Sequence, residues 1–354
     1  MSPALRRLAT TAAASALLSV GIVGIGEATA RAMELLRLLP TKELRIAAPL
    51  AVRPHPFLGF CLREGATRQA GTPVEQRIGA HGYRGAPIPP KSTGGLRIVC
   101  LGDSTMYGDS LAEKDTIPAK LEATLRERLP RRKVDVLNAG VLQYSSAETF
   151  AAMALRISDL RPDVVVIYEG GNDVAPRLVR PFRSDYAHYR AVWERDYDEG
   201  PDRLFEWSSF FVASRWLIGI YPAAQRMDWY TVNPLPPSTA NEKEFAFVRS
   251  SETQFARNQA ATVALARASG ARTLLCSPAV DRTKEGPYSW AVRAMDQFRK
   301  TQPITAGAQG GIHLDLTEAL AGEKDAFRDT VHLTPVGARV VAARLCEEIV
   351  KRGW

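Results

Sequence analysis

The sequence predicts an α/β fold: a three-layer α/β/α sandwich on a parallel sheet, with an added helical insertion. Apolar runs of strand length alternate along the chain with longer segments whose apolar residues recur at helical spacing. Such alternation favours parallel strands joined by helices that cover both faces of the sheet. The strand runs are almost continuously apolar, as is typical of strands buried on both faces.

Five strands and four helices account for this pattern. The predicted strands are Leu96–Leu101, Val134–Leu137, Val164–Tyr168, Thr273–Cys276 and Ile312–Leu316. The predicted helices are Ile117–Leu129, Ala147–Leu160, Glu252–Ala268 and Pro335–Lys351. Each helix lies between two strands or after the last strand, so the order of elements agrees with the predicted sandwich.

Residues 1–40 are expected to be a signal peptide or an N-terminal membrane anchor. Arg6 and Arg7 precede an uncharged run, Leu8–Gly26, which is long enough to cross a bilayer. Ala28-Thr29-Ala30 could serve as a cleavage site, but the helical pattern continues up to Pro40. That continuation favours an uncleaved anchor over a cleaved signal; a buried helix of a soluble protein is the remaining alternative.

The rest of the chain divides into an arm and a main domain. Residues 41–94 are rich in Pro, Gly and Arg and are expected to form an irregular arm, with a few short strands, that packs on the domain. Residues 95–354 form the main domain, which an insertion at 174–251 interrupts. The many aromatic residues of the insertion suggest a small helical subdomain. It could form a lid or an acyl-binding wall, or its rings could simply pack it onto the core.

Composition excludes several classes of function. The chain has 354 residues and a net charge of +8, but its Lys and Arg residues are scattered and form no nucleic-acid motif. We therefore expect no nucleic-acid partner, and at most a preference for membrane surfaces. The four cysteines lack the spacing of metal ligands, so no metal site is expected. A disulfide framework is not expected either, although one bridge remains open.

Four short motifs carry the chemistry. They are Gly102-Asp103-Ser104-Thr105, Asn138-Ala139-Gly140, Gly170-Gly171-Asn172-Asp173 and Asp329-Thr330-Val331-His332. Each follows a predicted strand or precedes a predicted helix, so all four are expected at the carboxyl edge of the sheet, where sites of open α/β sheets form. Any one of them alone is ordinary turn chemistry.

Together the motifs predict a nucleophile with its base and its electrostatic stabilisers. Ser104 would be the nucleophile, with His332 as general base and Asp329 orienting the imidazole. Backbone N–H groups of Ser104 and Gly140 and the side-chain amide of Asn172 could stabilise an oxyanion. The alternatives are an N-cap serine, a surface turn capped by Asp329, and a glycine and an asparagine that only shape turns. Asp103 and Asp173 are expected to hold their loops.

These motifs resemble the SGNH/GDSL hydrolase superfamily, serine esterases and lipases on a flavodoxin-like sheet. Thr105 stands where the family's name-giving leucine would be. The resemblance implies Ser104, His332 and Asp329 as the catalytic residues, and Ser104, Gly140 and Asn172 as the oxyanion hole. The arm resembles that of membrane-anchored bacterial members, which ends in an Asn-x-x-Gly-aromatic-Arg element. Here Gly82-Tyr83-Arg84 is present, but Gly79 replaces the Asn.

The expected function is therefore that of an extracytoplasmic serine ester hydrolase that works through an acyl-enzyme. An O-acyl or O-acetyl glycan or another envelope ester is the favoured substrate. The alternatives are a lipase or lysophospholipase, an O-acyltransferase with the same site, and a non-catalytic envelope-binding protein. The protein would be held at the cell membrane by a single N-terminal anchor, or be secreted or periplasmic after cleavage. No cofactor, no metal and no obligate protein partner are expected.

Overall fold

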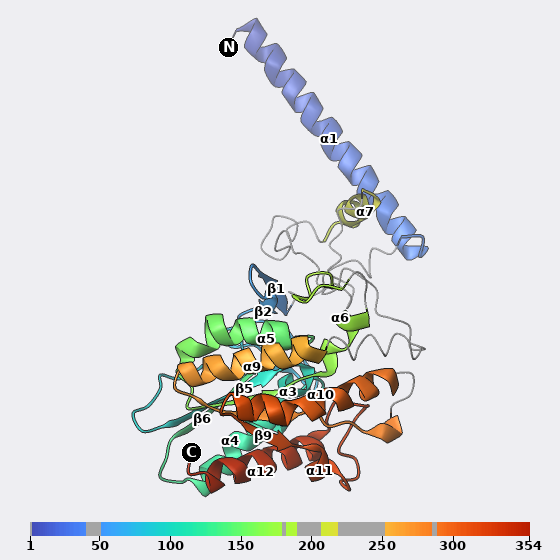
Figure 1. The fold of residues 1–354 in the computed structure, drawn as a ribbon. Helices are drawn as coiled ribbons and strands as arrows, with labels where there is room; N and C mark the ends of the chain where they lie inside the picture. The colour runs from blue at the N-terminus through green and yellow to red at the C-terminus, as the bar shows by residue number, and fades with distance from the viewer. Residues whose placement is uncertain (1, 40–50, 179–181, 190–206, 219–251, 285–288) are drawn as a thin grey trace. The chain divides into compact units, whose positions relative to one another are not determined.

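A computed structural model describes residues 2–39, 51–178, 182–189, 207–218, 252–284 and 289–354 (Figure 1). The chain divides into two compact units. The first comprises Met1–Leu50 and Glu194–Trp229, and the second comprises Ala51–Trp193 and Tyr230–Trp354. Most of the insertion lies outside the described residues, so the predicted helical subdomain and its use as a lid or wall stay predictions.

A five-stranded parallel sheet, in the order β6-β5-β7-β8-β9, forms the centre of the second unit. Its strands are β5 (Leu96–Gly102), β6 (Val134–Gly140), β7 (Val164–Tyr168), β8 (Arg272–Ser277) and β9 (Ile312–Asp315). β5, the first of these strands along the chain, lies between β6 and β7 and pairs with both, which is the flavodoxin-like order. The predicted α/β class and all five predicted strands are confirmed.

Helices cover both faces of this sheet (Figure 1). The described helices of the second unit are α3 (Ser104–Tyr107), α4 (Ile117–Arg128), α5 (Ser146–Ala152), α6 (Ala175–Leu178), α9 (Glu252–Ala268), α10 (Ser289–Ala308), α11 (Thr317–Leu320) and α12 (Pro335–Lys351). Short 3-10 turns cover Glu113–Asp115, Ser158–Leu160, Gly171–Asp173 and Arg282–Lys284. Helices α4 and α12 lie against one face, and α5 and α9 lie against the other.

Along each strand, alternate side chains point to opposite faces of the sheet and are buried under the helices there. Ile98, Cys100 and Val166 point to the face covered by α4 and α12, where Leu121 and Val341 complete a fully buried cluster. The intervening residues, such as Val99 and Ile167, are equally buried and lie on the opposite face. Burial on both faces explains why the strands read as continuous apolar runs.

Two helices differ from the prediction. The expected helix 147–160 is α-helical only to Ala152 and continues as a π-helical turn, Met153–Ile157, before the 3-10 turn. In that segment the hydroxyl of Ser158 donates to the Met153 carbonyl at 2.8 Å and so competes with the helical ladder. Helix α10 was not predicted. Its interior Pro303 breaks the sequence pattern, because proline normally ends a helix.

The arm forms two small antiparallel hairpins. The first pairs β1 (Val52–His55) with β2 (Gly59–Leu62), and the second pairs β3 (Thr67–Arg68) with β4 (Gln76–Arg77). Beyond them, Arg84 makes an isolated bridge to Asn138 of β6. The arm therefore packs on the edge strand of the sheet.

The first unit contains α1 (Pro3–Leu35) and α7 (Ser209–Leu217). Among the described helices, α1 is long and apolar enough to cross a membrane by length and composition. Its N-terminal cap is Ser2, whose hydroxyl accepts the N–H of Leu5 at 3.3 Å. All four cysteines lie in the second unit, where they are buried free thiols.

Candidate active site

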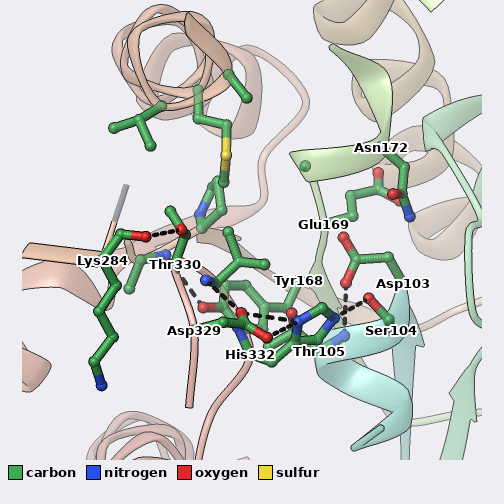
Figure 2. A pocket seen from close by; sticks show the side chains of 17 residues that line it. Asp103, Ser104, Thr105, Tyr168, Glu169, Asn172, Lys284, Asp329, Thr330 and His332 are labelled. Carbon is green, nitrogen blue, oxygen red and sulfur yellow. Dashed lines mark hydrogen bonds and ion pairs between the residues drawn. The ribbon is translucent and has the colours of Figure 1, made fainter. Parts of the chain in front are cut away.

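The nucleophile candidate lies on the tight turn that follows β5. The strand ends at Gly102, where a Cβ atom would lie 2.0 Å from the carbonyl oxygen of Tyr168, so only glycine fits. Asp103 then caps α3, its Oδ1 accepting the N–H of Thr105 at 2.9 Å. Ser104 is therefore the first residue of the helix and not its cap. Its hydroxyl is left to face the cavity (Figure 2).

The Asp329–His332 loop completes a chain of hydrogen bonds to this serine. His332 Nε2 lies 2.8 Å from Ser104 Oγ. On the other side of the ring, Nδ1 lies 2.9 Å from Asp329 Oδ2 and 3.0 Å from Oδ1. The carboxylate also accepts the N–H groups of Val331 and His332, which fixes the turn (Figure 2). The structure thus brings together Ser104, His332 and Asp329, which lie in two motifs far apart in the sequence.

The electrostatics of this loop suit a general base. Burial raises the pKa of Asp329, but the hydrogen bonds from the His332 ring and from two backbone N–H groups outweigh it and hold the pKa well below the usual value. Burial lowers the pKa of His332, yet its hydrogen bond to Asp329 and the charge of that carboxylate raise it overall. An ionised Asp329 therefore holds the Nδ1–H proton, which leaves the Nε2 lone pair directed at the serine.

Asn172 also lies at the cavity. It is part of the 3-10 turn that follows β7, and its side-chain amide donates to the carbonyl oxygen of Tyr144 at 3.0 Å. This bond fixes the orientation of the amide and uses one of its two N–H groups. The next residue, Asp173, accepts both the N–H and the hydroxyl of Ser146, at 2.9 and 2.5 Å. Asp173 thus ties this turn to the start of α5.

Gly140 has a different place from the one expected. Its N–H donates to Asn138 Oδ1 at 3.1 Å, and it is not among the described residues that line the cavity. A Cβ atom here would lie 2.3 Å from the backbone nitrogen of Tyr107, so the glycine allows β6 to approach α3 closely. This contact favours a packing role behind α3, and the role of Gly140 as an oxyanion donor stays a prediction.

The arm supports the nucleophile helix from its other end. The buried guanidinium of Arg84 donates to the carbonyl oxygens of Tyr107 and Gly108, at 2.9 and 2.6 Å, and to that of Leu111 at 2.5 Å. The same side chain forms an ion pair with Glu113, with a distance of 3.0 Å between Nε and Oε2. Because these carbonyls lie at and just beyond the end of α3, Arg84 caps the helix that carries Ser104.

Asp103, Glu169 and Asp173 are buried carboxyl residues, of which Asp103 and Glu169 line the cavity. Burial raises the pKa of Asp103 to about 6 and raises that of Glu169 well above its ordinary value. Glu169 lines the cavity, and neither of its oxygens has a partner that meets hydrogen-bond geometry. The side chains of Thr149 and Gln259 lower the pKa of Glu169 in part, against the larger effect of burial. The motif analysis missed Glu169, although it directly precedes Gly170.

The cavity has a volume of about 440 Å³. One wall comes from α10, through Ala291, Val292 and Met295, and is apolar. Ser104, His332 and Lys284 also line the cavity (Figure 2). Lys284 donates to the Phe327 carbonyl at 2.5 Å, so it braces the loop that precedes Asp329. Sequence reasoning missed this wall because it missed α10.

The remaining histidines lie elsewhere. His313 contacts Ser277, with 2.7 Å between Nε2 and Oγ, and His188 contacts the Pro176 carbonyl. His55 accepts backbone N–H groups in the first hairpin of the arm, and the His81 carbonyl accepts a hydrogen bond from Arg156. Only His332 among them lines the cavity with Ser104.

The chain is similar to a known protein family and to several solved structures. The model of the GDSL-like lipase/acylhydrolase family matches residues 100–340. The comparison with curated proteins gives no match. Solved structures that resemble the chain include a lipase/acylhydrolase from Enterococcus faecalis, with 15% identity, coverage of 73% of this chain and 96% of that one, and a TM-score of 0.42. An acetylxylan esterase from Geobacillus stearothermophilus, studied as a catalytic mutant, has 15% identity, the same coverage of both chains and a TM-score of 0.44.

Proposed function

The chain belongs to the GDSL-like lipase/acylhydrolase family and is a carboxylic ester hydrolase, and we propose that it works through an acyl-enzyme formed on Ser104. One observation carries the proposal above the others. A continuous chain of hydrogen bonds, Asp329 to His332 to Ser104, ends at a cavity with an apolar wall. This arrangement activates a hydroxyl that is otherwise a weak nucleophile.

In the first half of the reaction, Ser104 Oγ attacks the ester carbonyl while His332 Nε2 takes the hydroxyl proton. Asp329 holds the imidazole by its Nδ1–H and stabilises the positive charge that develops. The carbonyl C–O bond to the leaving alcohol then breaks, and His332 returns the proton to that alcohol. In the second half, water attacks the acyl-enzyme by the same route and releases the carboxylic acid and a free Ser104.

The oxyanion that forms in each half needs donors that are already in place. The backbone N–H of Ser104 and the amide of Asn172 are the two candidates at the cavity. Asn172 suits this role because its bond to the Tyr144 carbonyl holds it in one orientation before substrate arrives. Fixed donors cost no reorganisation during the reaction, and each is worth about 10² to 10³ in rate.

For the substrate we favour an acyl ester of the cell envelope, in the first place an O-acetylated glycan. The anchor-like α1 supports an envelope location, with the catalytic domain outside the cytoplasm. A second candidate is a lipid ester, because the apolar wall formed by Val292 and Met295 could accept a longer acyl chain. The polar groups at the cavity, Glu169 and Asn172, suit a hydroxylated alcohol moiety instead.

A series of p-nitrophenyl esters with rising acyl length separates these candidates. We expect the wild-type protein to hydrolyse them and Ser104→Ala to lose at least about 10³-fold in kcat/KM. An optimum at acetyl supports the glycan esterase, and an optimum at long chains supports the lipid esterase. Equal activity in Ser104→Ala, with a matched circular dichroism spectrum, would overturn the assignment of the nucleophile.

A further inference from the structure

Helix α7 is joined to α1 through one carboxylate. Glu27 of α1 accepts the Ser208 hydroxyl at 2.7 Å and the N–H groups of Ser209 and Phe210 at 3.1 and 2.9 Å. The two N–H groups belong to the first turn of α7, and an isolated helix would leave them without partners. Arg31, one turn further along α1, donates to the same carboxylate at 2.6 Å. A side chain of α1 therefore caps α7.

Two further contacts extend this junction. The Ser209 hydroxyl donates to Glu34 at 2.6 Å, so Glu27, Arg31 and Glu34 present one polar stripe of α1 to α7. At Gly26 a Cβ atom would lie 2.7 Å from the ring of Phe210, so the glycine lets this ring approach the helix closely. We call these contacts, from Gly26 to Glu34, the α1–α7 clamp.

The clamp begins where the apolar part of α1 ends. The uncharged run 8–26 spans about 28 Å at 1.5 Å per residue, close to the hydrocarbon thickness of a bilayer. Arg6 and Arg7 flank it on one side, and Glu27 follows it on the other. When α1 spans a membrane, the clamp lies at the level of the headgroups, on the side opposite Arg6 and Arg7.

The α7 segment carries exposed aromatic and apolar side chains of the kind that occur at the headgroup level of a membrane. Trp207 is 64% exposed, and Leu217 and Ile218 at the other end are 72% and 66% exposed. Tryptophan is enriched at membrane interfaces, where its ring meets both acyl chains and water. From Ser209 to Leu217 the helix has a single charged residue, Arg215, whose guanidinium lies over the Phe211 ring and is buried. Exposed apolar residues at both ends of a helix held at this depth suit contact with lipid.

The clamp also bears on cleavage of the N-terminal segment. Ala30, the last residue of the candidate cleavage site, is 5% exposed and is the one buried residue of α1. It lies within a continuous helix between two clamp residues, Glu27 and Glu34. Cleavage after Ala30 would detach Glu27 from the α7 segment that it caps.

We propose that residues 207–218 form a membrane-surface element that α1 clamps at the headgroup level, with Trp207, Leu217 and Ile218 in contact with lipid. The element rests on the membrane anchoring proposed above, and it does not depend on the catalytic residues. Since α7 lies within the insertion of the catalytic domain, the chain meets the bilayer a second time through it. The α1–α7 clamp is retained in the mature protein.

The four native cysteines are buried, so a cysteine placed on the surface can be labelled selectively. We would label Ile218→Cys with an environment-sensitive fluorophore in the full-length protein, reconstituted into phosphatidylcholine–phosphatidylglycerol vesicles. A quencher attached to the lipid acyl chains should remove most of its fluorescence. The same label at Glu323→Cys, an exposed turn of the catalytic domain, should keep its fluorescence.

The clamp is tested by Glu27→Gln in the Ile218→Cys background, with Glu318→Gln as the matched control at an exposed site. We expect Glu27→Gln to reduce the quenching at position 218 and Glu318→Gln to leave it unchanged. Position 218 quenched no more than position 323 would overturn the proposal. So would a label at 218 that is shielded by a protein partner and not by lipid, or an intact mass that begins after Ala30. Esterase activity of the same samples reports separately on the catalytic site.

Discussion

The described part of the molecule contains two serine–histidine pairs with nearly the same geometry. Ser104 and His332 are 2.8 Å apart, and Ser277 and His313 are 2.7 Å apart, each measured between Oγ and Nε2. Both pairs are formed near the carboxyl edge of the sheet, since Ser277 ends β8 and Ser104 follows β5. A distance criterion alone would give two candidate sites.

The surroundings of the two pairs are different. Asp329 binds the far nitrogen of His332, whereas no carboxylate among the described residues hydrogen-bonds to His313. The pKa of His332 is raised, while burial lowers that of His313 despite the nearby charge of Asp315. Ser277 is fully buried, whereas Ser104 faces the cavity. We infer that the orienting carboxylate and access from the cavity, more than the serine–histidine contact, distinguish the candidate site from a structural pair.

The largest expected effect separates the two histidines. His332→Ala removes the base and should lower kcat/KM by about 10⁵-fold. His313→Ala should stay within about tenfold of wild type, because its loss leaves only a buried Ser277 hydroxyl without its partner, a cost in stability. Steady-state kinetics on a p-nitrophenyl ester, with thermal melts of both variants, makes the comparison. Equal losses of activity would contradict the distinction between the pairs.

The next largest effect distinguishes the two carboxylates near these histidines, Asp329 and Asp315. Asp329→Asn should lower kcat by about 10⁴-fold, because an amide can donate to Nδ1 and so hold the imidazole in the tautomer whose Nε2 is protonated. Wild-type kcat/KM should rise with pH through a midpoint above 6.5, as His332 loses its proton. Asp329→Asn removes the bond and the charge that raise this pKa and leaves the burial that lowers it, so the midpoint should move to lower pH.

Asp315→Asn is the matched control for this change, since Asp315 lies near His313 and is exposed. Its pH profile should keep the wild-type midpoint. A midpoint that stays in place in Asp329→Asn, or moves in Asp315→Asn, would show that His332 does not set the acidic limb.

The smallest effect concerns stability. Glu169 has a raised pKa in the folded protein, so the folded state binds more protons than the unfolded one above about pH 4.5, and stability falls as pH rises. Glu169→Gln should make the loss of stability between about pH 4.5 and pH 8 smaller. It should raise the free energy of unfolding at pH 8 by about 1 kcal/mol. It should change little near pH 4. Urea denaturation at both pH values measures it, with Glu318→Gln as the exposed control. Equal stabilisation at both pH values would show that titration is not the cause.

Local signals predicted most of the fold. The strands were found because burial on both faces makes them continuously apolar, and α9 and α12 have the expected bounds, Glu252–Ala268 and Pro335–Lys351. The predicted site residues Ser104, His332, Asp329 and Asn172 line one cavity, and each follows or precedes such an element. The carboxyl ends of parallel strands lie at the same edge of the sheet, so residues that follow different strands are expected to lie close together.

What the sequence could not predict depends on contacts between distant segments. The interior Pro303 concealed α10, and with it the apolar wall of the cavity. The close approach of Gly140 to Tyr107 is a contact that no local pattern shows. In the sequence Glu169 is one polar residue at a strand end, and its burial at the cavity is visible only in three dimensions.

The central claim is that Ser104, and not Ser277, is the nucleophile. A fluorophosphonate that reacts with activated serines tests it directly, with the modified residue located by peptide mass spectrometry. The account predicts one adduct, on Ser104, that is lost in Ser104→Ala and retained in Ser277→Ala. An adduct on Ser277, or undiminished labelling of Ser104→Ala, would contradict it.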